Sequence, residues 1–176
     1  MNAGNSGSVP TIGSVKTSGS RSPESQLKAF IDKYSPEIAA QARAILKKLR
    51  ARVPGAIVLV YDNYNALAIG IGTTERVSDI IFSIALYPRW VSMFFMDGVN
   101  LPDPEKLLKG GGKRIRHIVL EDPSMLDKPA VRGLIAHALK GEGKAMEKSK
   151  AGRLIIKSIS AKQRPRRYRA STNAGR

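Results

Sequence analysis

The sequence has 176 residues, of which 42% are hydrophobic, so it is long enough for one packed domain and too short for two of ordinary size. It contains no cysteine, which excludes disulfides, thiolate metal sites and cysteine nucleophiles. The formal net charge of +16 is uneven: residues 147–176 hold ten basic side chains and one acidic, whereas residues 24–146 hold 18 basic and 13 acidic. We therefore expect a mildly basic domain followed by a strongly basic extension.

The first 22 residues are rich in Gly, Ser, Asn and Thr and contain no apolar run of the kind found in signal peptides. Such a polar segment is predicted to be disordered. The most apolar stretch, residues 80–96, is interrupted by Pro88 and Arg89 and is shorter than the roughly 20 residues that a membrane helix needs. A cytoplasmic protein without a membrane partner is expected.

Two helix-start patterns follow. Ser22-Pro23-Glu24 and Ser35-Pro36-Glu37 each place a hydroxyl cap before a proline and an acidic residue, and apolar residues then recur at helical spacing. Pro54-Gly55 ends the second predicted helix. A third helix is predicted after Asp127-Lys128-Pro129 and ends at the glycines 141 and 143.

Between these helices the apolar residues change to a strand-like pattern. The predicted strands are residues 56–62, 66–71, 80–87, 90–96 and 114–121, with a possible sixth at 154–159. This order predicts an α+β, two-layer fold: an antiparallel sheet of about five to six strands packed against N-terminal and C-terminal helices. The predicted organisation is a polar N-terminal segment (1–22), the α+β domain (23–146) and a basic C-terminal extension (147–176).

Four stretches carry a family resemblance: KKLRARVP (47–54), VYDNYNAL (60–67), SIALYPRWVSMFF (83–95) and GGGKRIRHIVL (110–120). On these, residues 26–140 resemble the YdhG-like domain family of small bacterial proteins. The resemblance implies a compact α+β fold similar to that of frataxin. Some members are described as iron chaperones, but their acidic iron-binding surfaces have no counterpart residue by residue in this mildly basic domain.

The glycine loop 110–112 is followed by Lys113, Arg116 and His117. Glycines allow backbone N–H groups to turn toward an anion, and adjacent cations supply the opposite charge. The spacing fits neither a Walker A loop nor G-x-G-x-x-G. The alternative is a flexible turn whose charged side chains face water.

Polar and aromatic residues also gather at predicted strand ends, with Tyr61 and Asn63 near one turn and Arg89-Trp90 at another. Such groups suit a ligand pocket, although turn chemistry and core aromatics explain them as well. The first hypothesis is therefore non-enzymatic binding of a small anionic ligand or a metal ion. Its site residues are Tyr61, Asn63, Arg89, Lys113, Arg116 and His117, with Tyr61, Arg89, Arg116 and His117 expected to converge.

Catalytic and metal motifs are missing from the sequence. G-x-S-x-G and H-E-x-x-H are absent, no motif identifies a cofactor, and an enzyme is not expected. Hard-metal binding by Asp62, Glu121 and Asp122 is left open.

The second hypothesis is sequence-independent nucleic-acid binding through the basic extension, carried by Arg164, Arg166, Arg167 and Arg169. Basic residues of the second predicted helix would assist it. The alternative is a solvated tail that binds polyanions only incidentally. The sequence does not predict an oligomeric state.

Overall fold

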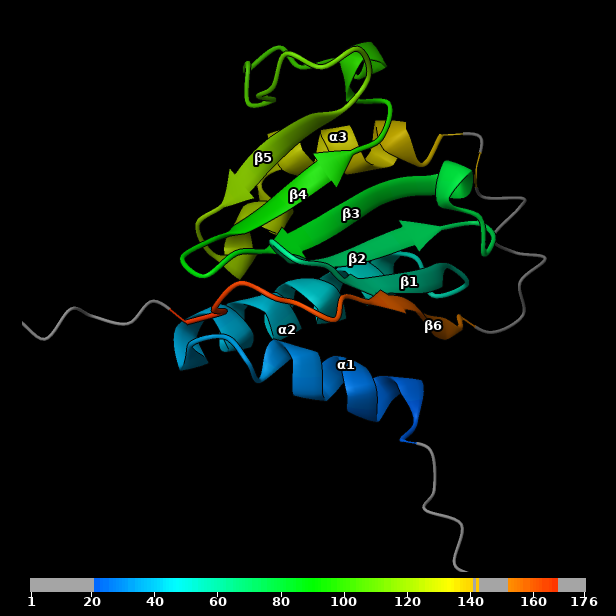
Figure 1. The fold of residues 1–176 in the computed structure, drawn as a ribbon. Coiled ribbons are helices and arrows are strands. Elements are labelled where there is room, and N and C mark those ends of the chain that lie inside the picture. The colour runs from blue at the N-terminus through cyan, green and yellow to red at the C-terminus, as the bar shows by residue number, and fades with distance from the viewer. Residues whose placement is uncertain (1–20, 141, 143–151, 168–176) are drawn as a thin grey trace, which may run out of the picture.

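The computed structural model describes residues 21–140, 142 and 152–167, and most of the N-terminal segment predicted to be disordered lies outside these ranges (Figure 1). The described chain forms three α-helices and a six-stranded sheet. The helices are α1 (Pro23–Ile31), α2 (Pro36–Arg52) and α3 (Pro129–Ala138). The strands are β1 (Ile57–Asp62), β2 (Leu67–Gly72), β3 (Ile80–Leu86), β4 (Val91–Phe95), β5 (Arg116–Leu120) and β6 (Leu154–Ile159).

Both predicted helix starts are confirmed by their caps. The Ser22 side chain accepts a hydrogen bond from the Ser25 N–H at 3.2 Å, and the Ser35 side chain accepts one from the Ile38 N–H at 3.4 Å. In each helix a proline occupies the first turn, where its missing N–H costs nothing. Local sequence therefore determines where α1 and α2 begin.

The strand order is β5-β4-β3-β2-β1-β6. Strands β1 to β5 pair antiparallel, but β6 pairs parallel with β1, so the sheet is mixed rather than wholly antiparallel. The direction differs because the chain after α3 returns to the end of the sheet where β1 begins, and β6 then runs alongside it. Just before β6 the backbone passes very close to the residues that precede β1, since a Cβ on Gly152 would lie 2.6 Å from the Pro54 carbonyl oxygen. Only glycine, which has no Cβ, fits at this position.

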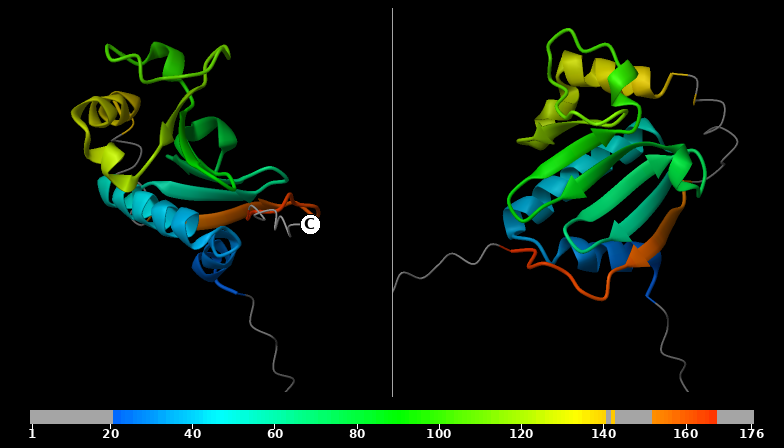
Figure 2. Two further views of the ribbon diagram at one scale, coloured as in Figure 1. Left: turned by 90° about the vertical axis from the view of Figure 1, so that its left-hand side faces the viewer. Right: turned by 45° about the horizontal axis from the view of Figure 1, so that its top comes forward.

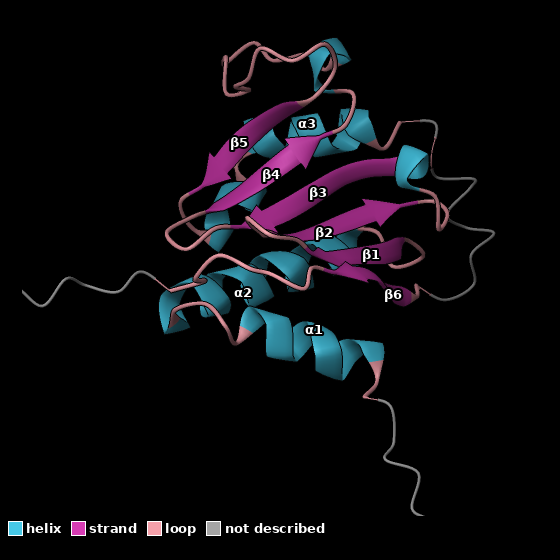
Figure 3. Ribbon diagram, viewed as in Figure 1, coloured by secondary structure: helices cyan, strands magenta, loops and turns pink. Residues whose placement is uncertain are grey.

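The predicted α+β, two-layer class is confirmed (Figures 2 and 3). All three helices lie on one face of the sheet. Strand side chains that face the helices form the core with the apolar stripes of those helices; examples are Val60, Ile69, Ile84, Met93 and Ile118. The opposite face carries no helix in the described parts of the chain, and we call it the open face.

The predicted extension contributes to this fold. Beyond β6, the chain passes the end of β1, where the Ser160 N–H donates to the Asp62 carbonyl oxygen at 2.9 Å. It then reaches the turn between β1 and β2, where the Arg164 N–H donates to the Tyr64 carbonyl oxygen at 2.9 Å. Among the described helices, none has the length and apolar character needed to cross a membrane.

Candidate functional site

The open face is built from the strand residues that alternate with the core residues. Two rows of cross-strand partners cover it from β1 to β5. The first row is Leu59, Gly70, Ser83, Phe94 and His117, and the second is Tyr61, Ala68, Ala85, Ser92 and Val119. No residue in either row is acidic, and the central positions are small.

Small residues at the centre leave a hollow of about 420 Å³, which we call the trough. Ala68, Ser83 and Ala85 contribute to its floor, and the larger Tyr87 and Phe94 border it. Its volume lies within the range of about 300–1,000 Å³ that is typical of small-ligand pockets. The described lining carries no charged side chain; it consists of Asn63, Tyr64, Asn65, Ala66, Ala68, Ser83, Ala85, Tyr87, Phe94, Met96 and Ile115.

Aromatic rings are paired around the trough. Tyr87 stacks on Trp90 with ring centroids 4.9 Å apart and planes at 22°, because the β3–β4 turn joins them through a Tyr87 N–H to Trp90 carbonyl bond of 2.9 Å. Phe94 lies directly opposite His117 on the neighbouring strand, and their centroids are 5.2 Å apart. At the β1–β2 turn, the Arg164 guanidinium lies 5.8 Å from the Tyr64 ring centroid.

The structure separates the residues predicted to converge. Asn63 lines the trough, and Tyr61 and His117 share the open face, but β1 and β5 have three strands between them. Arg116 precedes His117 in β5 and therefore points to the other face. Its guanidinium donates to the carbonyl oxygens of Gly112 at 2.6 Å and Ile115 at 2.9 Å. Arg89 lies in the β3–β4 turn beside Trp90.

The glycine loop is closed by a two-residue bridge between Lys109 and His117, and Arg116 caps its carbonyl groups. Lys113 is directed to a second, larger cavity of about 860 Å³ near the end of α3. The described wall of that cavity balances its charges, with Lys113, Arg114 and Lys140 beside Asp79, Asp97 and Glu142. Because the charges of this wall are mixed, the cavity selects neither anions nor cations, and we place the candidate site in the trough.

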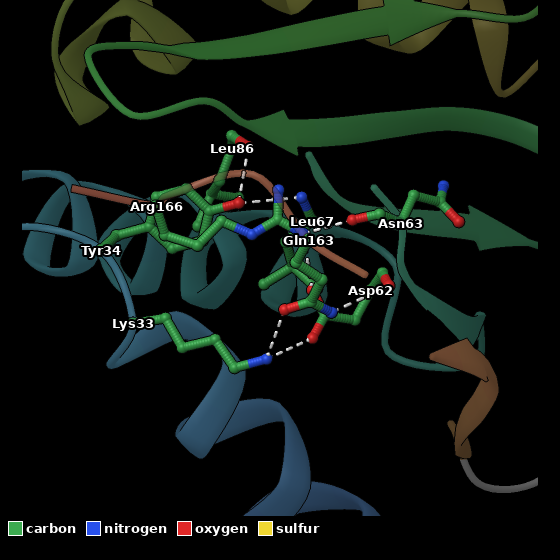
Figure 4. Close-up of polar contacts among 8 residues, drawn as sticks. All are labelled: Lys33, Tyr34, Asp62, Asn63, Leu67, Leu86, Gln163 and Arg166. Carbon is green, nitrogen blue, oxygen red and sulfur yellow. Dashed lines mark hydrogen bonds and ion pairs between the residues drawn. The ribbon is translucent and has the colours of Figure 1, made fainter. Parts of the chain in front are cut away.

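The predicted nucleic-acid residue Arg166 is buried, with only 4% of its side chain exposed. It pairs with Asp62, whose carboxylate is equally buried: Arg166 Nη2 lies 2.9 Å from Asp62 Oδ1, and Lys33 Nζ lies 2.6 Å from Asp62 Oδ2 (Figure 4). Gln163 completes this cluster by accepting from Lys33 at 2.9 Å and donating to the Asp62 carbonyl oxygen at 3.2 Å. We call Lys33, Asp62, Gln163 and Arg166 the Asp62 cluster. In this structure Arg166 serves the fold, and its burial leaves little guanidinium surface for a phosphate, so nucleic-acid contact by Arg166 stays a prediction without structural support.

Tyr34 lies beside the Asp62 cluster and joins it to the sheet. Its hydroxyl donates to the Leu86 carbonyl oxygen and accepts from the Leu67 N–H, both at 2.9 Å, and its ring centroid lies 5.6 Å from the Arg166 guanidinium carbon. Burial raises the pKa of Tyr34 to about 12. The Tyr34 hydroxyl therefore satisfies one backbone group of β2 and one of β3 while it remains protonated.

The other basic residues proposed for nucleic-acid binding are mostly engaged elsewhere. Arg167 donates to the carbonyl oxygens of Asp32 at 2.9 Å and Tyr34 at 3.0 Å, at the end of α1, and Arg169 lies outside the described residues. On α2, Lys48 and Arg52 pair with Asp127, and Arg50 pairs with Glu24. Arg164 is exposed beside the trough.

The trough itself was missed by the sequence reasoning, although the sequence holds a signal for it. Residues 67–72 read LAIGIG, in which every second residue is large and every residue between is Ala or Gly. That alternation indicates a strand with one packed face and one sparse face.

Metal ligands do not gather in the part of the chain that the structure describes, where no three His, Asp or Glu side chains form a possible ion site. Asp62, one of the carboxylates left open for metal binding, is already paired with two cations. Asp122 accepts a hydrogen bond from the Ser124 N–H at 2.7 Å and caps a 3₁₀ turn.

Comparison with protein-family models, curated proteins and solved structures found no match. Membership of the YdhG-like family therefore stays a prediction from the sequence.

Proposed function

We propose that the protein is a non-enzymatic binding module that holds a small ring-bearing ligand in the trough. The observation that carries this proposal is the trough on the open face, an uncharged hollow of about 420 Å³ bordered by aromatic rings. Aromatic and small apolar surfaces favour flat ligands, since stacking gains contact area without requiring a deep cavity.

The polar groups of the trough suit recognition better than catalysis. Asn63, Asn65 and Ser83 place amide and hydroxyl groups around the floor, where they would orient a ring by hydrogen bonds. Arg164, on the Tyr64 ring, stands where an acidic substituent of the ligand would project. This keeps the expected preference for an anionic ligand and favours an organic anion over a metal ion, in a protein we expect to act in the cytoplasm.

The aromatic anion 1-anilinonaphthalene-8-sulfonate is a suitable fluorescent probe for the trough. We expect saturable binding to the native chain, and Ser83→Phe should weaken it about tenfold or more, because the added ring occupies the floor. Ser83 faces the open side of β3, where phenylalanine suits a strand, so the fold should be retained. Fluorescence titration measures the affinity, and circular dichroism checks the fold.

Val119→Phe is the matched control, since it adds a ring to the same face on β5 without entering the trough. This variant should bind the probe as the native chain does. Equal affinity for the native chain and Ser83→Phe would reject the trough as the binding site.

A further inference from the structure

We propose that the small ring held in the trough is one base of a single-stranded nucleic acid, which lies across the open face with further unpaired bases stacked on its aromatic rings. This inference rests on the proposed function and names the substrate class of the same site. It also moves nucleic-acid binding from the C-terminal extension, where the sequence suggests it, to the sheet.

The arrangement of aromatic rings on the open face suits a chain of several bases. The open face presents aromatic groups at three separate places: Tyr64 at the β1–β2 turn, the Tyr87–Trp90 pair at the β3–β4 turn, and the Phe94–His117 pair on β4 and β5. Tyr64 is 50% exposed and Trp90 is 38% exposed. A single small ring needs only one such place, whereas a chain of unpaired bases uses several.

Cations at the two sides of the open face complement the charge of a phosphate backbone. Lys109 lies directly opposite His117 in an antiparallel bridge, so its exposed side chain belongs to the open face at the β5 edge. Arg164 lies at the other side, beside Tyr64. With neighbouring strands about 4.8 Å apart, these two cations are separated by roughly 20 Å. One nucleotide cannot reach both, but a strand of several nucleotides places a phosphate near each.

The rows between these cations contain no acidic residue, so nothing on this part of the sheet repels a phosphate backbone. On the helix face, Lys48, Arg50 and Arg52 each pair with an acidic side chain, which makes these three cations less available to a phosphate. A shallow face with exposed rings selects single strands, since the base faces of a duplex are covered by stacking.

Fluorescence anisotropy with the full chain and a labelled twelve-residue thymidine oligonucleotide tests the inference. Phe94→Ala removes one ring and should weaken binding roughly 5- to 150-fold, the range that corresponds to the loss of one base–aromatic stack. Val99→Ala truncates an apolar side chain that is 46% exposed, in the turn Gly98–Asn100 away from the trough, and should leave the affinity unchanged.

The salt dependence tests the two cations separately. Arg164→Gln and Lys109→Gln should each reduce the slope of log affinity against log salt by about 0.7, the value for one phosphate contact with a single strand. Lys28→Gln removes the same charge from α1, where Lys28 pairs with Asp32, and should leave the slope unchanged.

The outcomes separate the two proposals. If the anilinonaphthalene probe binds in the trough but the oligonucleotide binds no better than thymidine monophosphate, the nucleic-acid inference fails and the proposed function stands. Tight, salt-sensitive oligonucleotide binding that ignores Phe94→Ala and both glutamine variants would also overturn the inference, because diffuse attraction to the basic chain would then explain it. If the native chain binds neither the anilinonaphthalene probe nor the oligonucleotide, both proposals are rejected.

Discussion

Replacing Arg166 with methionine is expected to lower the free energy of unfolding by about 3 kcal/mol, because it removes one partner of a buried ion pair. Asp62 would keep Lys33, whose side chain is 38% exposed, and this places the loss near the lower end of the usual 3–5 kcal/mol. Methionine fills similar volume, so the lost charge rather than a cavity dominates. Urea denaturation followed by circular dichroism measures the change.

The control for this prediction is the double variant Asp62→Leu with Arg166→Met. It replaces both buried ions with apolar side chains and should be more stable than Arg166→Met alone, since no carboxylate is left inside the domain without its partner. Arg164→Gln, at an exposed position, should change stability by less than about 0.5 kcal/mol. If Arg166→Met also changed the free energy of unfolding by less than about 0.5 kcal/mol, the Asp62 cluster would not be what fixes the C-terminal extension to the domain.

Tyr34→Phe is expected to destabilise the fold by about 2 kcal/mol at neutral pH. The loss of the hydroxyl leaves the Leu67 N–H and the Leu86 carbonyl oxygen without this partner inside the protein. The ring packing is kept, so the effect isolates the two hydrogen bonds. Thermal and urea denaturation at neutral pH measure the loss, and an unchanged stability would contradict the bridging role of Tyr34.

The same residue predicts an alkaline dependence. The pKa of Tyr34 rises from 10.0 to about 12 on folding, so the folded state holds the phenol proton more tightly than the unfolded state does. The stability that this shift contributes is fully present below pH 10, and about 3 kcal/mol is lost as the pH rises through about 12. Tyr34→Phe should lack this component, so the stability difference between native and variant chains should narrow or reverse across that interval. If the stability of the native chain and that of Tyr34→Phe fell in parallel with rising pH, this role of the Tyr34 phenol would be contradicted.

Local patterns in the sequence predict most of the fold. The serine–proline–acid starts of α1 and α2 specify backbone groups three residues away, and the structure contains those bonds. The five antiparallel strands follow from alternating apolar residues and turn residues within each hairpin. The direction of β6 depends on where the chain returns after α3, which no local pattern encodes.

The candidate site was less predictable for a physical reason. A charged residue looks the same in sequence whether it faces water or a buried partner, and the partners Asp62 and Arg166 are 104 residues apart. Adjacent strand residues such as Arg116 and His117 point to opposite faces, so closeness in sequence did not mean convergence. The trough exists because the residues at its floor are small, and small residues carry no functional group that would mark a site in the sequence.

Ligand binding in the trough can be tested by backbone amide chemical-shift mapping by NMR, with 1-anilinonaphthalene-8-sulfonate added to isotope-labelled full-length protein. We expect the largest changes on Ala68, Ser83, Ala85 and Phe94, across neighbouring strands of the open face, while α1 and α2 remain unperturbed. Changes concentrated instead around Lys113, Arg114 and the end of α3 would place the site in the larger cavity and contradict binding in the trough.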